Sequence, residues 1–186
     1  MKKIVLTFGF LSGAILAGMM AITLPLSMSG AIRFENMEII GYTTMVLAFL
    51  LVFFGIRSYR ENVAGGAVTF GRAVKVGVLI TLIACAMYVI SWEIIYYNFT
   101  PDFVDKYATA TIEKMRAKGA SEAAIAKTTQ EMASFKVLYA NPFFNVGMTF
   151  MEVFPVGLLM TLISAAILRR RPDASMTPRV SATAGS

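Results

Sequence analysis

Four long apolar runs alternate with polar segments along this chain. The third and fourth runs each contain a single carboxylate, Glu93 and Glu152, and the others are free of charge. A hydrocarbon core of about 30 Å needs roughly 20 helical residues, and only helices or closed barrels satisfy their backbone polar groups inside it. The pattern therefore predicts an all-α integral membrane bundle of four transmembrane helices. Their expected positions are about 4–28, 39–56, 73–98 and 143–168.

The longest polar segment, between the third and fourth runs, has the pattern of two amphipathic helices. Thr100 is positioned to cap the first, with Pro101 at its first position, and Gly119 ends it. The second begins after Ser121 and breaks at Pro142. We expect a helical hairpin over about 101–140 that caps the bundle mouth or lies at the lipid interface; a partner or ligand site there is the alternative. Its apolar faces are Val104, Ala108, Ile112 and Met115, then Ile125, Met132 and Phe135.

Composition supports the membrane assignment. Of 186 residues, 57% are hydrophobic and only 15% are charged, which leaves too little polar surface to coat a water-soluble globule. The net charge of +6 does not indicate nucleic-acid binding, because most cations flank apolar runs. Membrane lipids are the expected partners, and a protein partner cannot be named from the sequence.

The distribution of cations predicts the orientation. Ten of the seventeen Lys and Arg residues fall on one side if the four runs alternate through the membrane, against six in the hairpin segment. By the positive-inside rule, both termini are cytoplasmic and the hairpin is extracytoplasmic. Residues 1–171 then form a single membrane domain, and 172–186 form a flexible cytoplasmic tail. The ten cations are Lys2, Lys3, Arg57, Arg60, Arg72, Lys75, Arg169, Arg170, Arg171 and Arg179.

The first run has one alternative interpretation, as a cleaved signal peptide that ends near Gly30. It is much longer than the apolar region of a typical signal, so we expect it to remain as a membrane helix. The single cysteine, Cys85, lies in the middle of the third run and predicts no disulfide.

Small residues recur at every fourth position in three of the runs. Such stripes let membrane helices approach closely, so we expect them to face other helices of the bundle. Assembly of a homo-oligomer through one of these faces is the alternative. The stripes are Gly9 and Gly13; Ala73, Gly77, Thr81 and Cys85; and Gly157, Thr161 and Ala165.

The two intramembrane carboxylates are the candidate ionisable site. Glu93 continues the stripe that begins at Gly77, and Glu152 lies three residues before Pro155, whose missing N–H leaves a carbonyl free. Acids inside a membrane are costly, so they are paired, protonated or functional. The structural alternative is that Glu93 reaches water and that Glu152 bonds a side chain such as Tyr88 or Thr149.

The residue inventory does not indicate an enzyme. The chain has no His, one Cys and no acidic cluster with metal-ligand spacing, so we expect no catalytic triad, metal or cofactor. A structural, interaction or accessory membrane protein is the preferred interpretation. A small oligomeric transporter or channel subunit that handles a proton or cation is the first alternative, and a carboxylate-dependent lipid enzyme is the second.

Three stretches of sequence resemble a known family. They are GAVTFGRAVKVG at 66–77, the segment 88–103, and MEVFPVG at 151–157 with SAAILRR at 164–170. Together they resemble the bacterial membrane family called domain of unknown function 4199, over about residues 3–171. The resemblance implies a bacterial inner-membrane protein with four helices, and it brings no established activity or site residue.

Overall fold

The computed structural model describes residues 1–170, apart from the side chains of Phe34 and Glu35. Over these residues the chain is all-helical and has no strand. Four of the helices, α1, α2, α3 and α6, are long and apolar enough to cross a membrane. The six helices are α1 (Lys2–Met28), α2 (Phe34–Asn62), α3 (Phe70–Phe99), α4 (Phe103–Ala117), α5 (Glu122–Tyr139) and α6 (Pro142–Leu168).

The second helix is longer at both ends than the apolar run that predicts it. It continues past residue 56 because its charged end is compatible with a helix: Arg57 pairs with Glu61 one turn later at 3.0 Å. The guanidinium of Arg60 also donates to the carbonyl of Leu168 at 3.4 Å, which satisfies an end group of α6. Hydropathy marks the part of α2 that is apolar enough to cross a membrane, and the helix continues beyond it into a charged segment with side-chain pairs.

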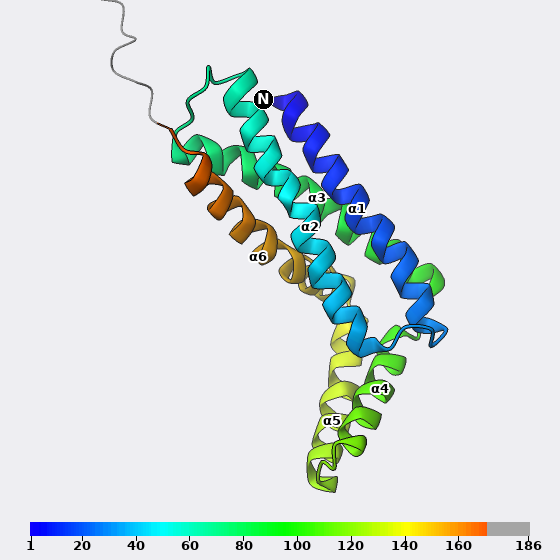
Figure 1. The fold of residues 1–186 in the computed structure, drawn as a ribbon. Coiled ribbons are helices and arrows are strands. Elements are labelled where there is room, and N and C mark those ends of the chain that lie inside the picture. Colours follow the sequence, from blue (N-terminus) through cyan, green and yellow to red (C-terminus); the bar gives the residue numbers. More distant parts are fainter. Residues whose placement is uncertain (171–186) are drawn as a thin grey trace, which may run out of the picture.

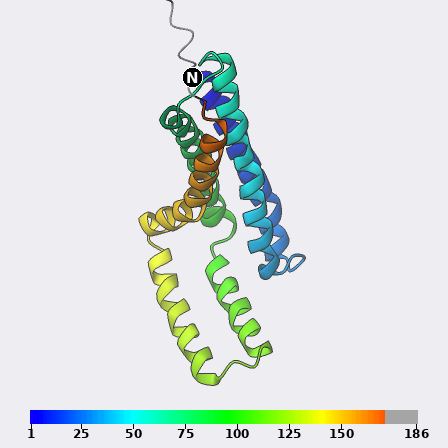
Figure 2. The same cartoon turned by 60° about the vertical axis from the view of Figure 1, so that its left-hand side comes forward.

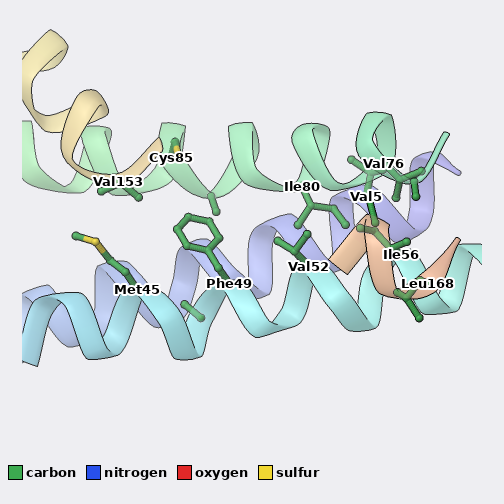
Figure 3. Close-up of a cluster of buried hydrophobic side chains, with 14 of the residues drawn as sticks. Val5, Met45, Phe49, Val52, Ile56, Val76, Ile80, Cys85, Val153 and Leu168 are labelled. Carbon is green, nitrogen blue, oxygen red and sulfur yellow. The ribbon is translucent and has the colours of Figure 1, made fainter. Parts of the chain in front are cut away.

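The four long helices form a bundle in which α1 packs on α2 and α3, and α6 packs on the same two helices (Figure 1). The core is the side of α2 that faces α3 and α6, with Phe49 and Ile56 fully buried. Figure 3 shows Phe49 between the helices, with Ile80 of α3 and Val153 of α6 in the same cluster. Cys85 is part of this core and is fully buried, as expected for a residue in the middle of the third run.

The small-residue stripes lie between helices of the bundle, as predicted. A Cβ atom built on Gly77 would lie 2.5 Å from Cγ2 of Thr161, and one built on Gly157 would lie 2.5 Å from Cγ2 of Thr81. The hydroxyls of Thr81 and Thr161 are 3.1 Å apart. Each glycine thus accommodates the threonine of the facing helix, which brings α3 and α6 into close contact.

The two ends of the bundle differ in charge and in shape. The N-terminus, the α2–α3 connection and the end of α6 lie together at one end, and the hairpin lies at the other (Figures 1 and 2). Arg171, Arg179 and the predicted tail at 172–186 lie outside the described residues. The other eight flanking cations fall on the segments gathered at the first end, namely Lys2, Lys3, Arg57, Arg60, Arg72, Lys75, Arg169 and Arg170.

Helices α4 and α5 form the predicted hairpin, which extends away from the bundle as an arm (Figure 2). Lys136 of α5 lies 2.6 Å from an oxygen of Asp105 in α4, which joins the two helices near their base. The hydroxyl of Ser121 accepts from the backbone N–H of Ala124 at 3.3 Å and caps α5. At the tip, Gly119 has a φ of 73°, a conformation that favours glycine. The predicted apolar faces are confirmed, because their seven residues are buried or half-buried.

The predicted start of the first hairpin helix was wrong. Thr100 caps the end of α3, where its backbone N–H donates to the carbonyl of Ile95, and α4 begins only at Phe103. The carbonyl of Thr100 accepts from the N–H of Phe103, so residues 100–103 form a tight turn. Asp102 closes this turn beside Lys106 at 3.0 Å, and that ammonium lowers the pKa of Asp102. This turn separates α3 from α4 and changes the direction of the chain between them.

Candidate functional site

A cavity of about 480 Å³ lies at the hairpin end of the bundle. All four long helices and the base of the hairpin contribute to its wall, so residues far apart in sequence meet here. Two residues of the hydrophobic core, Met45 and Leu16, also line the cavity. The lining residues are Leu16, Met19, Met20, Thr23, Leu24, Met37, Glu38, Ile40, Gly41, Tyr42, Thr44, Met45, Tyr88, Trp92, Phe103, Tyr107, Tyr139 and Glu152.

A bend in α6 makes room for this cavity. Helix α6 changes direction along its length, so that its first half runs away from α2 (Figure 2). Pro155 lies inside the helix at this level and cannot donate to the carbonyl of Met151, which is the ordinary cause of such a kink. Glu152 precedes the proline and lines the cavity on the side where α6 diverges from α2.

Glu152 lines the cavity together with four tyrosines. Its carboxyl is close enough to two of them, Tyr88 and Tyr139, to act on each hydroxyl electrostatically. The side chain is exposed to the cavity, and among the described residues it has no hydrogen-bond partner. The hydrogen bond from Glu152 to Tyr88 or Thr149, which was the structural alternative, is therefore not formed among the described residues. Thr149 instead donates to the backbone carbonyl of Asn145 at 2.9 Å.

Beside the cavity, Trp92 and Asn145 form a buried polar contact. The indole Nε1 donates to Oδ1 of Asn145 at 2.9 Å, and the hydroxyl of Thr149 lies 3.3 Å from the same oxygen. Because an indole N–H can only donate, this bond fixes which amide atom is the oxygen. The amide nitrogen Nδ2 is buried and has no partner among the described residues. The Asn145 amide group therefore has unused hydrogen-bond donor capacity next to the cavity wall.

Aromatic rings form the wall on the hairpin side. Trp92 packs edge-to-face on Phe103, with centroids 5.0 Å apart, and stacks on Tyr96 at 5.8 Å. Tyr139 packs edge-to-face on Tyr96 at 5.4 Å. Burial raises the pKa of Tyr139 to about 12, and the nearby Glu152 carboxyl adds to the rise. The Tyr139 hydroxyl therefore stays protonated at physiological pH and can donate a hydrogen bond.

A second, more open cleft of about 840 Å³ lies next to the cavity on the hairpin side. Glu38 and Tyr107 line both spaces, so the cavity and the cleft adjoin at these two residues. The cleft lies between the α1–α2 connection and α4 and carries Asp102 and Lys106 on its wall. Glu152 therefore lines a cavity that adjoins the cleft beside the hairpin.

The two carboxylates predicted from the sequence are not brought together in this cavity. Glu152 lines it, whereas Glu93, although next to Trp92, is not among its lining residues. Glu93 is half-buried, and its Oε1 is enclosed without a hydrogen-bond partner among the described residues. The Trp92 ring occupies the position on α3 that faces the cavity. Glu93 therefore points elsewhere.

Several residues of the site were missed by sequence reasoning. Asn145 precedes Thr149 by four residues and Glu152 by seven, so the three share a face of α6, and this polar spacing was the available signal. Glu38 and Tyr42 gave no such signal, because they come from a different helix. Tyr139 was assigned only to the end of a hairpin helix.

Comparison with known proteins identifies one family. A family model described as a protein of unknown function (DUF4199) matches residues 7–170, which include most of α1, the other three long helices and the hairpin. Neither a curated protein nor a solved structure matches the chain.

Proposed function

The chain belongs to the DUF4199 family, and we propose that it is an accessory protein of the bacterial inner membrane that binds a small molecule in the Glu152 cavity. In this proposal the protein is not an enzyme and has no cofactor. Its partners are membrane lipids and the bound small molecule, and it does not bind nucleic acid. The single observation that carries the proposal is the cavity itself.

The cavity has the properties of a ligand site. Its volume of about 480 Å³ lies within the range of about 300–1,000 Å³ that is typical of small-molecule pockets. Methionine, leucine and aromatic side chains make up most of the wall, and Glu152, Thr23 and Tyr88 supply a few polar groups. Flexible methionines adapt to ligands of different shape. This combination favours a ligand with an apolar body and at least one polar group.

The proposed orientation places both termini in the cytoplasm and the hairpin outside. The eight described flanking cations at the end opposite the hairpin support it through the positive-inside rule. Three exposed aromatic residues at the base of the hairpin, Tyr97, Phe99 and Phe143, suit the level of the membrane interface. The cavity mouth then lies close to the outer interface, where amphipathic molecules collect.

Trp92 gives a direct test, because it is the only tryptophan of the chain and it lines the cavity. The neutral fluorophore N-phenylnaphthylamine, added to the protein in nanodiscs, should accept energy from Trp92 in a saturable manner. Gly41→Leu should abolish this signal, because Gly41 lines the cavity and a Cβ there meets no atom within 4 Å, so the new side chain has room to fill the space.

Gly147→Leu is the matched control for this experiment. Gly147 also has open space around its Cβ position, but it does not line the cavity. We expect Gly147→Leu to bind the fluorophore like the wild type. Energy transfer that never saturates, or that persists unchanged in Gly41→Leu, would contradict the proposed binding function.

Transport of a proton or cation is the second candidate, with the protein acting as a homo-oligomer. The boundary at Glu38 and Tyr107 favours it, because there the cavity that Glu152 lines adjoins the open cleft. If Glu152 carries the ion, Glu152→Gln in proteoliposomes should fold normally and lose the flux measured with a pH-sensitive dye. Flux equal to that of wild type in the Gln variant would remove this candidate.

A further inference from the structure

The wall of the cavity is acidic. Two carboxylates, Glu152 and Glu38, line it, and no Lys or Arg of the described residues does. Building on the proposed binding function, we infer that the ligand is a lipophilic organic cation, an amine or quaternary ammonium group attached to an apolar body, with its charge next to Glu152.

The first argument is the state of Glu152. Its carboxyl lies in a membrane-spanning helix and lacks a hydrogen-bond or ion-pair partner among the described residues. An ionised carboxylate at such a place is expensive unless a counter-charge accompanies it. A ligand cation would supply that counter-charge. An anionic ligand would add a second negative charge and bind poorly.

The second argument is the aromatic wall. Tyr88, Trp92 and Tyr139 line the cavity together with Glu152. The faces of such rings attract a cation within about 6 Å, and a quaternary ammonium group, which cannot donate hydrogen bonds, is recognised mainly in this way. The carboxylate and the rings therefore favour the same charge. A neutral apolar ligand would use the rings and leave Glu152 without a partner.

The third argument is the entrance. Glu38 stands where the cavity meets the outer cleft, and the Lys and Arg residues of that cleft do not line the inner cavity. The cleft carboxylates Asp102 and Asp105 are ion-paired with Lys106 and Lys136, so Glu38 supplies the negative charge at this boundary. A carboxylate there attracts cations and repels anions before they reach Glu152. The cation is thus selected at the entrance and again inside.

The test uses two ions of nearly equal size and shape and opposite charge, tetraphenylphosphonium and tetraphenylborate. Binding of each is measured by equilibrium dialysis against protein-loaded nanodiscs, with empty nanodiscs subtracted, so the result does not depend on the neutral fluorophore. We expect the wild type to bind the phosphonium at least about tenfold more tightly than the borate. In Glu152→Gln this preference should fall to within about twofold.

Two further variants make the result specific. Glu152→Asp keeps the charge and should retain the preference, even if its affinity for both ions falls. Glu93→Gln removes a carboxylate outside the cavity and should leave the preference unchanged. Equal binding of the two ions by the wild type, or a preference that survives in Glu152→Gln, would overturn the inference. Saturable binding of N-phenylnaphthylamine without any charge preference would overturn it while leaving the proposed binding function intact.

Discussion

The indole nitrogen of Trp92 lies 2.9 Å from Oδ1 of Asn145, and this hydrogen bond joins α3 to α6 at the edge of the cavity. Both side chains are buried, and Asn145 is fully enclosed. The bond holds the Trp92 ring in the cavity wall beside the first turn of α6. It thus contributes both to the stability of the bundle and to the shape of the site.

The first prediction concerns this bond. Asn145→Ala should lower the free energy of unfolding by about 1–3 kcal/mol, because the buried indole N–H is left without an acceptor. Thermal unfolding in detergent would measure the loss. Asn98→Ala is the control: the exposed Asn98 bonds the carbonyl of Ile94 in its own helix, and we expect a change within about 0.5 kcal/mol. Equal unfolding temperatures for the two variants would show that the bond does not stabilise the bundle.

The second prediction concerns the contact between α3 and α6. Gly157→Leu should destabilise the protein by about 1–3 kcal/mol or more through overpacking, because a Cβ there would lie 2.5 Å from Thr81 and 2.8 Å from Phe49. Gly147→Leu, on the same helix but with open space at its Cβ position, should unfold almost like the wild type. If both variants melt at the same temperature, the close approach of the helices is not a source of stability.

The predicted contact faces could be read from the sequence because they depend on local spacing alone. Gly77 and Gly157 belong to sequence patterns with a small residue at every fourth position. In the structure each lies opposite a threonine of the other helix. The four spans were likewise predictable from hydropathy. The C-terminal end of α2 was not, because the helix continues beyond its apolar part into a charged segment in which Arg57 pairs with Glu61.

The candidate site was predictable only in part, for a physical reason. Glu152 stood out as a charge in an apolar run, but its surroundings come from five other helices and depend on the bend at Pro155. Pairing Glu152 with Glu93 assumed that both face the centre of the bundle. The structure instead places the Trp92 ring in the wall, and Glu93 lies outside the cavity.

The third prediction tests the orientation. Alkaline phosphatase fused after Gly119, at the tip of the hairpin, should be active in a bacterial host, because this enzyme folds only outside the cytoplasm. The same reporter fused after Gly66, in the connection between α2 and α3, should be inactive. A reporter that folds only in the cytoplasm provides the control and should give the opposite pattern at both positions. Phosphatase activity at Gly66 would reverse the proposed topology.

The most direct test of the central claim asks whether the cavity is open inside the membrane domain. Thr23 lines the cavity, whereas its neighbour Ile22 is exposed on the outside of α1 and does not line it. The native Cys85 is fully buried and should contribute little background. Cysteine is introduced at each position in turn, and the reconstituted protein is treated with a water-soluble maleimide. Thr23→Cys should be labelled, because its thiol faces the cavity. Ile22→Cys should not be labelled, because lipid surrounds that side chain. Tetraphenylphosphonium should slow the labelling of Thr23→Cys. Equal labelling at the two positions, or no labelling at Thr23→Cys, would contradict the account.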